Sequence, residues 1–111
     1  MYWRIDKDHI ADEGCDRTGH AVGHMEPGTK LYDFRLYDGD GELYYECRAD
    51  REAITNDDHD GGIYSAYQWA MHDSGCTDLR LKLDDLNEIY PGLRRINANL
   101  AAEDGWVPVY G

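Results

Sequence analysis

Residues 31–48 read Leu31-Tyr-Asp-Phe-Arg-Leu-Tyr-Asp-Gly-Asp-Gly-Glu-Leu-Tyr-Tyr-Glu-Cys-Arg48, two runs in which apolar and polar side chains alternate. Alternation with a period of two is typical of a strand with one buried face. The dipeptide Asp40-Gly41 between the runs is a strong signal for a two-residue turn. The pattern therefore predicts a β-hairpin at about 31–48.

The side chains of the two runs also predict how the strands pair. With Asp40-Gly41 as the turn, the register gives two apolar pairs, two opposite-charge pairs and one aromatic pair. These are Leu36 with Tyr45, Phe34 with Cys47, Arg35 with Glu46, Asp33 with Arg48, and Tyr37 with Tyr44. Opposite-charge and aromatic pairs across two strands each contribute about 0.2–1 kcal/mol, so we expect this register to be preferred.

Two helices are expected after the hairpin. One is predicted at about 62–74, where Gly75 follows as a C-terminal stop. Its apolar side chains recur at helical spacing and predict the buried face: Ile63, Ala66, Tyr67, Ala70 and Met71. The second helix is predicted at about 91–103, because Pro91 opens and Gly105 ends another apolar stripe.

Further strands are expected at 2–6, 76–83 and 106–110, the last at a sheet edge because it contains Pro108. Residues 7–30 and 49–60 are expected to be polar loops. The order of these elements predicts a single α+β domain over residues 1–111, with helices packed on a mainly antiparallel sheet.

The composition excludes several classes of function. The 111 residues include 23 Asp and Glu against 11 Lys and Arg, a formal net charge of −12. A nucleic-acid binder needs a basic surface, so direct binding to nucleic acid is not expected, nor is binding to an anionic membrane. No run reaches the length of a membrane span or forms a signal peptide. The three widely spaced cysteines favour reduced thiols, and we expect a cytoplasmic protein.

Three segments resemble parts of small, acidic, uncharacterised bacterial proteins. They are Trp3-Arg-Ile-Asp-Lys-Asp-His-Ile10, Phe34-Arg-Leu-Tyr-Asp-Gly-Asp-Gly-Glu-Leu-Tyr-Tyr-Glu46 and Ser74-Gly-Cys-Thr-Asp-Leu79. This resemblance implies a small α+β domain and supplies no catalytic residue. In size and charge the chain is also similar to the small acidic inhibitors made by phages and mobile elements, of the anti-CRISPR or antirestriction type.

The acidic residues concentrate in the first 60 positions, which hold 16 acids and 7 bases. Alternate carboxylates on a strand lie about 6.6 Å apart and can follow successive phosphates of a nucleic acid. We therefore expect a nucleic-acid mimic, an inhibitor that blocks the basic nucleic-acid-binding groove of a protein partner. The expected partner-binding residues are Asp6, Asp8, Asp12, Glu13, Asp16, Asp38, Asp40, Glu42, Asp50, Glu52, Asp57, Asp58, Asp60 and Trp69.

A second hypothesis is a salt-adapted or well-solvated accessory domain that binds a protein partner through tyrosine and tryptophan. Trp69 lies away from the centre of the apolar face of its predicted helix, so it either covers a loop or contacts a partner. A third hypothesis is a small zinc- or calcium-binding domain. Cys15, His20 and His24 suit zinc but lack a fourth ligand at standard spacing.

The segment Asn56-Asp-Asp-His-Asp-Gly-Gly-Ile63 resembles the start of a calcium loop, but Tyr67 stands where the bidentate glutamate belongs. No nucleophile elbow, P-loop or zinc-protease motif is present in the sequence. We therefore expect no enzyme, no cofactor, and no catalytic or metal-binding residue.

Overall fold

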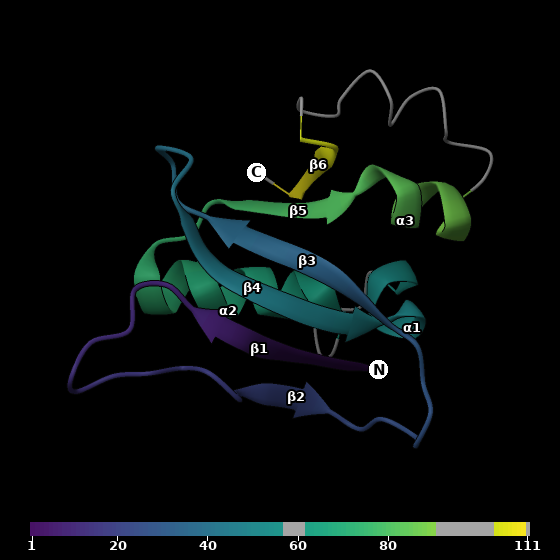
Figure 1. The fold of residues 1–111 in the computed structure, drawn as a ribbon, viewed down its shortest axis with the longest axis horizontal. Coiled ribbons are helices and arrows are strands. Elements are labelled where there is room, and N and C mark those ends of the chain that lie inside the picture. Colours follow the sequence, from purple (N-terminus) through teal and green to yellow (C-terminus); the bar gives the residue numbers. More distant parts are fainter. Residues whose placement is uncertain (57–61, 91–103, 111) are drawn as a thin grey trace.

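The computed structural model of the protein describes residues 1–56, 62–90 and 104–110, which contain six strands and three helices (Figure 1). The strands are β1 (Tyr2–Asp8), β2 (Ala21–Gly23), β3 (Leu31–Tyr37), β4 (Leu43–Asp50), β5 (Asp78–Lys82) and β6 (Trp106–Tyr110). The helices are α1 (Arg51–Thr55), α2 (Ile63–Ser74) and α3 (Leu83–Ile89). No helix in the described ranges is both long and apolar enough to cross a membrane.

The six strands form one antiparallel sheet in the order β2-β1-β4-β3-β5-β6. The predicted hairpin, β3 and β4, lies at the centre of the sheet, and the chain adds strands on both sides of it (Figure 1). This arrangement confirms the predicted α+β class with a mainly antiparallel sheet. It also confirms the edge position of β6, where Pro108 removes a backbone donor without disrupting a central ladder.

The register of the hairpin is confirmed for four of the five predicted pairs. These are Leu36 with Tyr45, Phe34 with Cys47, Arg35 with Glu46, and Asp33 with Arg48. The fifth is wrong, because Tyr37 lies opposite Leu43 rather than Tyr44. The apolar pairs face the core and the charged pairs lie on the opposite face of the sheet, as the alternation predicts.

The fifth pair shifts because the turn is longer than predicted. The backbone N–H of Asp38 donates to the carbonyl of Glu42 at 3.0 Å, and Gly41 between them has φ +84°. A three-residue loop that ends in a left-handed glycine is the usual alternative to a two-residue turn. The pairing of β3 with β4 therefore shifts by one residue between Leu36 and Tyr37, next to the turn, and this shift forms a β-bulge.

Helix α2 has the predicted bounds. Gly75 ends it in the left-handed conformation, φ +79°, and its N–H bonds back to the helix. Ile63, Ala66 and Ala70 are buried as expected. Met71 is not, because 38% of its surface is exposed, so that part of the predicted buried face is wrong.

Three short elements were not expected. Strand β2 and helix α1 lie in segments predicted to be loops, and α3 begins at Leu83, where the strand prediction ran too far. Helix α1 has only five residues, too few to show a helical period, and its start depends on a cap: Asp50 Oδ1 accepts from the N–H of Ala53 at 2.8 Å. The predicted helix at 91–103 lies outside the described residues and stays a prediction.

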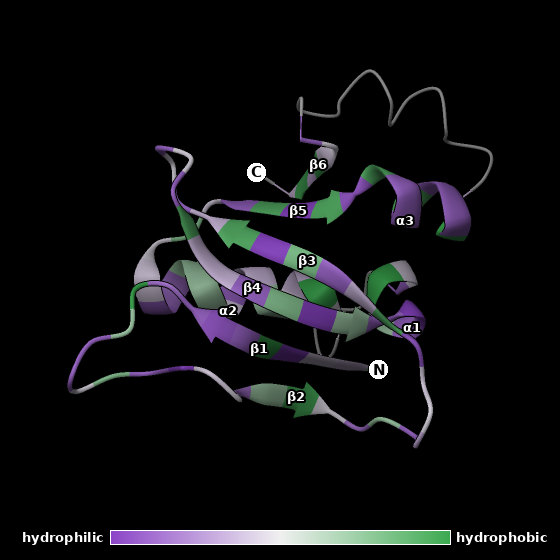
Figure 2. Ribbon diagram, in the orientation of Figure 1, coloured by the Kyte–Doolittle hydropathy of each residue, from purple (hydrophilic) through white to green (hydrophobic). Residues whose placement is uncertain are grey.

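Helix α2 packs on one face of the sheet, which we call the inner face (Figure 1). Apolar and polar residues alternate along the central strands, as Figure 2 shows by colour. Trp3 Nε1 donates to Ser65 Oγ at 3.0 Å, and the hydroxyl of Tyr45 lies 2.7 Å from Ser74 Oγ, so two hydrogen bonds join this face to α2. Among the described elements, no helix covers the opposite, outer face of the sheet.

Candidate functional site

Two of the acidic segments lie at the same end of the sheet. Strand β1 runs antiparallel to β4, and the N–H of His9, just after β1, donates to the carbonyl of Tyr44 at 2.9 Å. The loop that follows β1 therefore leaves the sheet at the end where the hairpin turns (Figure 1). We call residues 9–17 and 38–42 together the acidic end.

The third acidic segment lies at the opposite end of β4. Asp50 ends this eight-residue strand and Glu52 lies in α1. At about 3.3 Å per residue, eight residues separate the two ends by roughly 23 Å. The loop after β1 and the hairpin turn therefore share one end of the sheet, and the segment with Asp50 and Glu52 does not. Asp57, Asp58 and Asp60 lie outside the described residues.

The acidic end carries six carboxylates that form no ion pair within the described part of the chain: Asp12, Glu13, Asp16, Asp38, Asp40 and Glu42. Asp38 is half-buried and the other five are exposed. Carboxylates that no cation of the same chain contacts are available to a cationic partner.

Backbone hydrogen bonds hold three of these carboxylates in place. Asp12 accepts from the N–H of Gly14 at 3.1 Å, and Asp16 accepts from the N–H of Thr18 at 2.9 Å. Asp38 accepts two N–H groups across the turn, at 2.8 and 2.9 Å. These bonds favour the ionised form and lower the pKa of both Asp16 and Asp38 below the ordinary value. The three groups are therefore oriented as well as charged.

Two of the expected partner-binding carboxylates are used inside the fold instead. The side chain of Asp8 is 0% exposed and accepts from the N–H groups of Ile10 and Arg17 at 3.0 and 2.9 Å. Asp50 is buried and caps α1, and it also accepts from the N–H of Tyr2 at 3.2 Å. Both carboxylates are structural, since each satisfies backbone donors that would otherwise lack a partner.

Trp69 covers a loop. Its ring stacks on His20 of the loop between β1 and β2, with centroids 4.6 Å apart and an interplanar angle of 13°. It also packs against Trp3 and Tyr45, at 6.0 and 5.5 Å between centroids. This arrangement corresponds to the first of the two roles considered for Trp69 and ties the loop to α2.

The zinc candidates are used in different ways. Cys15 lies exposed in a turn paired with Asp12, whereas His20 stacks on Trp69 and the N–H of His24 donates to the carbonyl of Met1. Within the described ranges, no three or more His, Cys, Asp and Glu side chains gather closely enough to hold a metal ion. Most of the calcium-like segment, residues 57–61, lies outside those ranges.

Neither buried cysteine is a nucleophile at neutral pH. Burial raises the pKa of Cys76 to about 12, and it raises the pKa of Cys47 well above the ordinary value. Burial likewise raises the pKa of Tyr45 to about 12. These groups on the inner face therefore stay protonated and contribute packing rather than chemistry.

The outer face of the sheet is a second charged surface, and sequence reasoning missed it. Polar positions of neighbouring strands bring together six cations, four carboxylates and one tryptophan. They are Arg4, Lys7, Arg35, Arg48, Arg80, Lys82, Asp6, Asp33, Glu46, Asp78 and Trp106. Charged residues alternate with apolar ones along β3, β4 and β5, and this pattern could have indicated the face. The sequence of the hairpin does not show, however, that β5 pairs with β3.

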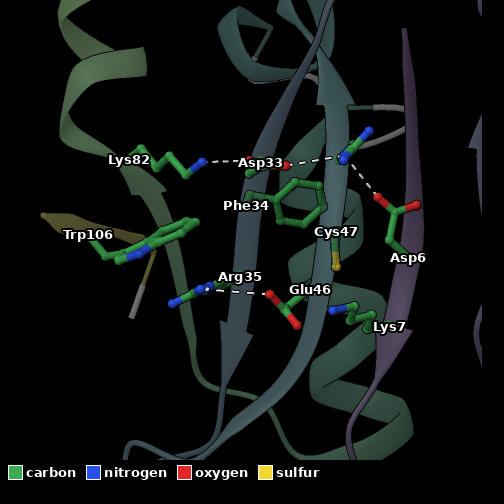
Figure 3. A pocket seen from close by; sticks show the side chains of 10 residues that line it. Asp6, Lys7, Asp33, Phe34, Arg35, Glu46, Cys47, Lys82 and Trp106 are labelled. Carbon is green, nitrogen blue, oxygen red and sulfur yellow. Dashed lines mark hydrogen bonds and ion pairs between the residues drawn. The ribbon is translucent and has the colours of Figure 1, made fainter. Parts of the chain in front are cut away.

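Ion pairs connect the side chains of the outer face (Figure 3). Asp33 contacts Lys82 at 2.6 Å and Arg48 at 3.3 Å, and Arg48 also contacts Asp6 at 3.1 Å. The other two carboxylates of this face, Glu46 and Asp78, contact arginines as well. Asp6, one of the expected partner-binding residues, therefore belongs to this network and not to the acidic end.

A hollow of about 270 Å³ lies among these side chains on the outer face (Figure 3). Trp106 lines one side of it and carries the guanidinium of Arg35 over its ring, 4.1 Å from the centroid. The lining is mostly polar and charged, so the hollow suits a charged ligand group rather than an apolar one.

A scan against protein-family models, a search of curated proteins and a search of solved structures each found no match to the chain.

Proposed function

We propose that the protein is an acidic interaction module whose acidic end blocks a basic nucleic-acid-binding surface of a partner protein. The observation that carries the proposal is the set of six carboxylates at the acidic end without an ion pair in the described structure. An inhibitor of an RNA-guided nuclease or of a restriction complex is the most concrete form of this function.

Three features of the acidic end support this function. The carboxylates belong to two segments that leave the sheet at the same end, and no ion pair in the described structure occupies them. Backbone N–H groups orient Asp12, Asp16 and Asp38, which reduces the entropy lost on binding. A groove built for phosphates accepts carboxylates at similar spacing, and the net charge of −12 accelerates the encounter.

The experiment is a DNA-cleavage assay with purified RNA-guided nucleases and restriction complexes. Each nuclease acts on its specific DNA substrate while the concentration of the protein is increased. Inhibition is expected to weaken by at least tenfold between about 50 and 200 mM salt, because counterions screen the contacts. Inhibition of only one or two of the complexes would support the proposal, because an inhibitor of this kind can be specific for one partner. Failure to inhibit any of them would contradict its inhibitor form.

A matched pair of variants locates the surface. Glu13→Gln/Asp40→Asn/Glu42→Gln removes three charges from the acidic end, at positions whose side chains make no hydrogen bond in the described structure. The control Glu26→Gln/Asp84→Asn/Asp85→Asn removes three charges elsewhere, also at positions without an ion pair in the described structure. We expect the first variant to lose at least tenfold in inhibition and the second to lose less than threefold. Equal losses would mean that net charge alone acts, which would contradict the proposed site.

One observation favours the accessory-domain alternative. Tyr64, Tyr67 and Tyr110 form a half-buried cluster between α2 and β6, with ring centroids 5.1 to 6.1 Å apart, and Val109 beside it is 39% exposed. Tyrosines of this kind anchor many protein interfaces. Binding to a partner that is insensitive to salt and lost on Tyr67→Ala would favour this function over the first.

A further inference from the structure

The outer face is positively charged on an acidic protein. It holds six of the eleven lysines and arginines of the chain together with four carboxylates, although the net charge of the whole chain is −12. The face therefore has a charge opposite to that of the acidic end.

The register of the sheet places arginines directly opposite each other twice. Arg4 lies opposite Arg48 across β1 and β4, and Arg35 lies opposite Arg80 across β3 and β5. Each of these four arginines has a carboxylate partner: Asp6 contacts both Arg4 and Arg48, Glu46 contacts Arg35, and Asp78 contacts Arg80. These contacts offset the repulsion between like charges in opposed positions, and the face still holds two more cations than carboxylates.

Aromatic rings hold two of these guanidinium groups in position. Arg35 lies over Trp106 with 4.1 Å from the guanidinium carbon to the ring centroid, and Arg80 lies over Tyr37 at 4.8 Å. Trp106 is only 6% exposed and Tyr37 only 7%, so both rings are fixed supports. An arginine stacked in this way keeps its donors in a plane, which suits two-point bonding to a carboxylate.

Donors remain beyond the ion pairs of the face. The shortest contacts of Arg48 with Asp6 and Asp33 both involve Nε, and half of its side chain is exposed. Lys82 is 45% exposed, and both residues line the hollow together with Arg35. Ligand carboxylates that enter the hollow would therefore lie beside these three cations.

From this geometry we propose that the outer face binds a short acidic peptide segment of a partner protein, with Arg35, Arg48 and Lys82 as the contact residues. The interleaved carboxylates Asp33 and Glu46 would repel a densely charged nucleic acid, and the acidic end adds to that repulsion. A peptide with a few spaced carboxylates is less strongly repelled by Asp33, Glu46 and the acidic end. This site is separate from the acidic end, so either proposal can fail without the other.

The test is a titration of the full chain at low salt with the acetylated and amidated peptide Glu-Gly-Gly-Glu-Gly-Gly-Glu, whose carboxylates are spaced. Binding is followed by the arginine Nε–H signals and the backbone amide signals in NMR spectra. We expect the signals of β3, β4 and β5 on the outer face to shift. Arg35→Gln/Arg48→Gln is expected to weaken binding at least tenfold. The control Lys30→Gln/Arg51→Gln removes two cations outside this face and is expected to weaken binding less than threefold.

A variant that is expected to tighten peptide binding distinguishes an effect on binding from an effect on folding. Asp33→Asn removes a competing carboxylate from the hollow and is expected to tighten peptide binding about threefold, whereas damage to the sheet could only weaken it. Unchanged amide dispersion confirms that each variant is folded. The proposal is overturned by loss of binding in Asp33→Asn, by equal losses in the arginine variant and its control, or by inorganic phosphate binding as tightly as the peptide.

Discussion

At the acidic end, six carboxylates lie without an ion pair in the described structure, whereas on the outer face all four carboxylates contact a cation. Both regions are polar, and both are built from residues that alternate with or follow the core positions of β1, β3 and β4. They differ in what balances the charge. Backbone N–H groups orient three of the six carboxylates of the acidic end, and side-chain cations neutralise the carboxylates of the outer face.

This difference separates the charges that hold the fold together from those available to a partner. A net charge of −12 treats all 23 acidic residues alike, yet Asp8 and Asp50 are buried structural groups and Asp33 belongs to an ion-pair network. Substitutions on the outer face are therefore expected to affect stability, and substitutions at the acidic end are expected to affect binding. The predictions below run from the largest expected effect on stability to the smallest.

The largest effect is expected for Trp106→Ala on the outer face. Trp106 is 6% exposed and supports Arg35 on β3, so its removal leaves a cavity and frees a guanidinium. Loss of a buried tryptophan typically costs about 3 kcal/mol or more of unfolding free energy. Urea unfolding measures the change, with Trp106→Phe as the milder control. A loss below about 1 kcal/mol would show that the ring is not part of the structural face.

Asp8→Ala is expected to cost about 2 kcal/mol, because two backbone N–H groups and the guanidinium of Arg17 lose a buried acceptor. Its matched control is Asp12→Ala, at an exposed position four residues later. Urea unfolding compares the two. Equal losses would contradict the division between the structural carboxylate at the end of β1 and the available carboxylate in the loop after it.

Asp33→Asn is expected to lower the unfolding free energy by about 1 kcal/mol, since it weakens contacts to Lys82 and Arg48 that are partly exposed to solvent. Added salt should reduce the difference from the wild type, because it screens the same contacts. A difference that grows with salt would argue against an electrostatic role for Asp33.

A smaller effect concerns acid pH. The turn N–H groups lower the pKa of Asp38 from its ordinary value of 3.8, so the ionised form is favoured by folding. Its contribution to stability is complete above the ordinary value and is lost as the pH falls through the lowered one. The free energy of unfolding, measured with urea between pH 6 and pH 2, should therefore fall less steeply with decreasing pH for Asp38→Asn than for the wild type. The same pH dependence for Asp38→Asn and the wild type would contradict the claim that the turn N–H groups stabilise the ionised form of Asp38.

The smallest effect on stability is expected for Glu13→Gln/Asp40→Asn/Glu42→Gln. These three side chains make no ion pair in the described structure, and exposed substitutions of this kind usually change the unfolding free energy by less than about 0.5 kcal/mol. Thermal and urea unfolding test this directly. A loss above 1 kcal/mol would mean that the acidic end holds the fold together.

Local patterns in the sequence were sufficient for the central hairpin and α2. Alternation fixed the faces of β3 and β4, and Gly75 marked the end of α2. Short elements escaped because five residues of α1 or three of β2 are too few for a period to show. The buried role of Asp8 escaped because it depends on an acceptor position created by the folded loop, to which Arg17 contributes from nine positions away.

The outer face could not be predicted for a related reason. Its two arginine pairs join strands that are not neighbours in sequence, and the opposition of Arg35 and Arg80 exists only because β5 pairs with β3. The acidic end was partly predictable. Charge counting selected its residues, but the same count also selected Asp50 and Glu52, which the length of β4 places at the other end of the sheet.

The most direct test of the acidic end is an NMR titration of the full chain with a hexalysine peptide at low salt, followed by backbone amide shifts. The largest shifts are expected at residues 11–17 and 38–42, with little change at 24–30 and 50–55. Shifts concentrated around Glu26 and Glu52 instead, or spread evenly over all exposed carboxylates, would contradict the claim that the available charge lies at one end of the sheet.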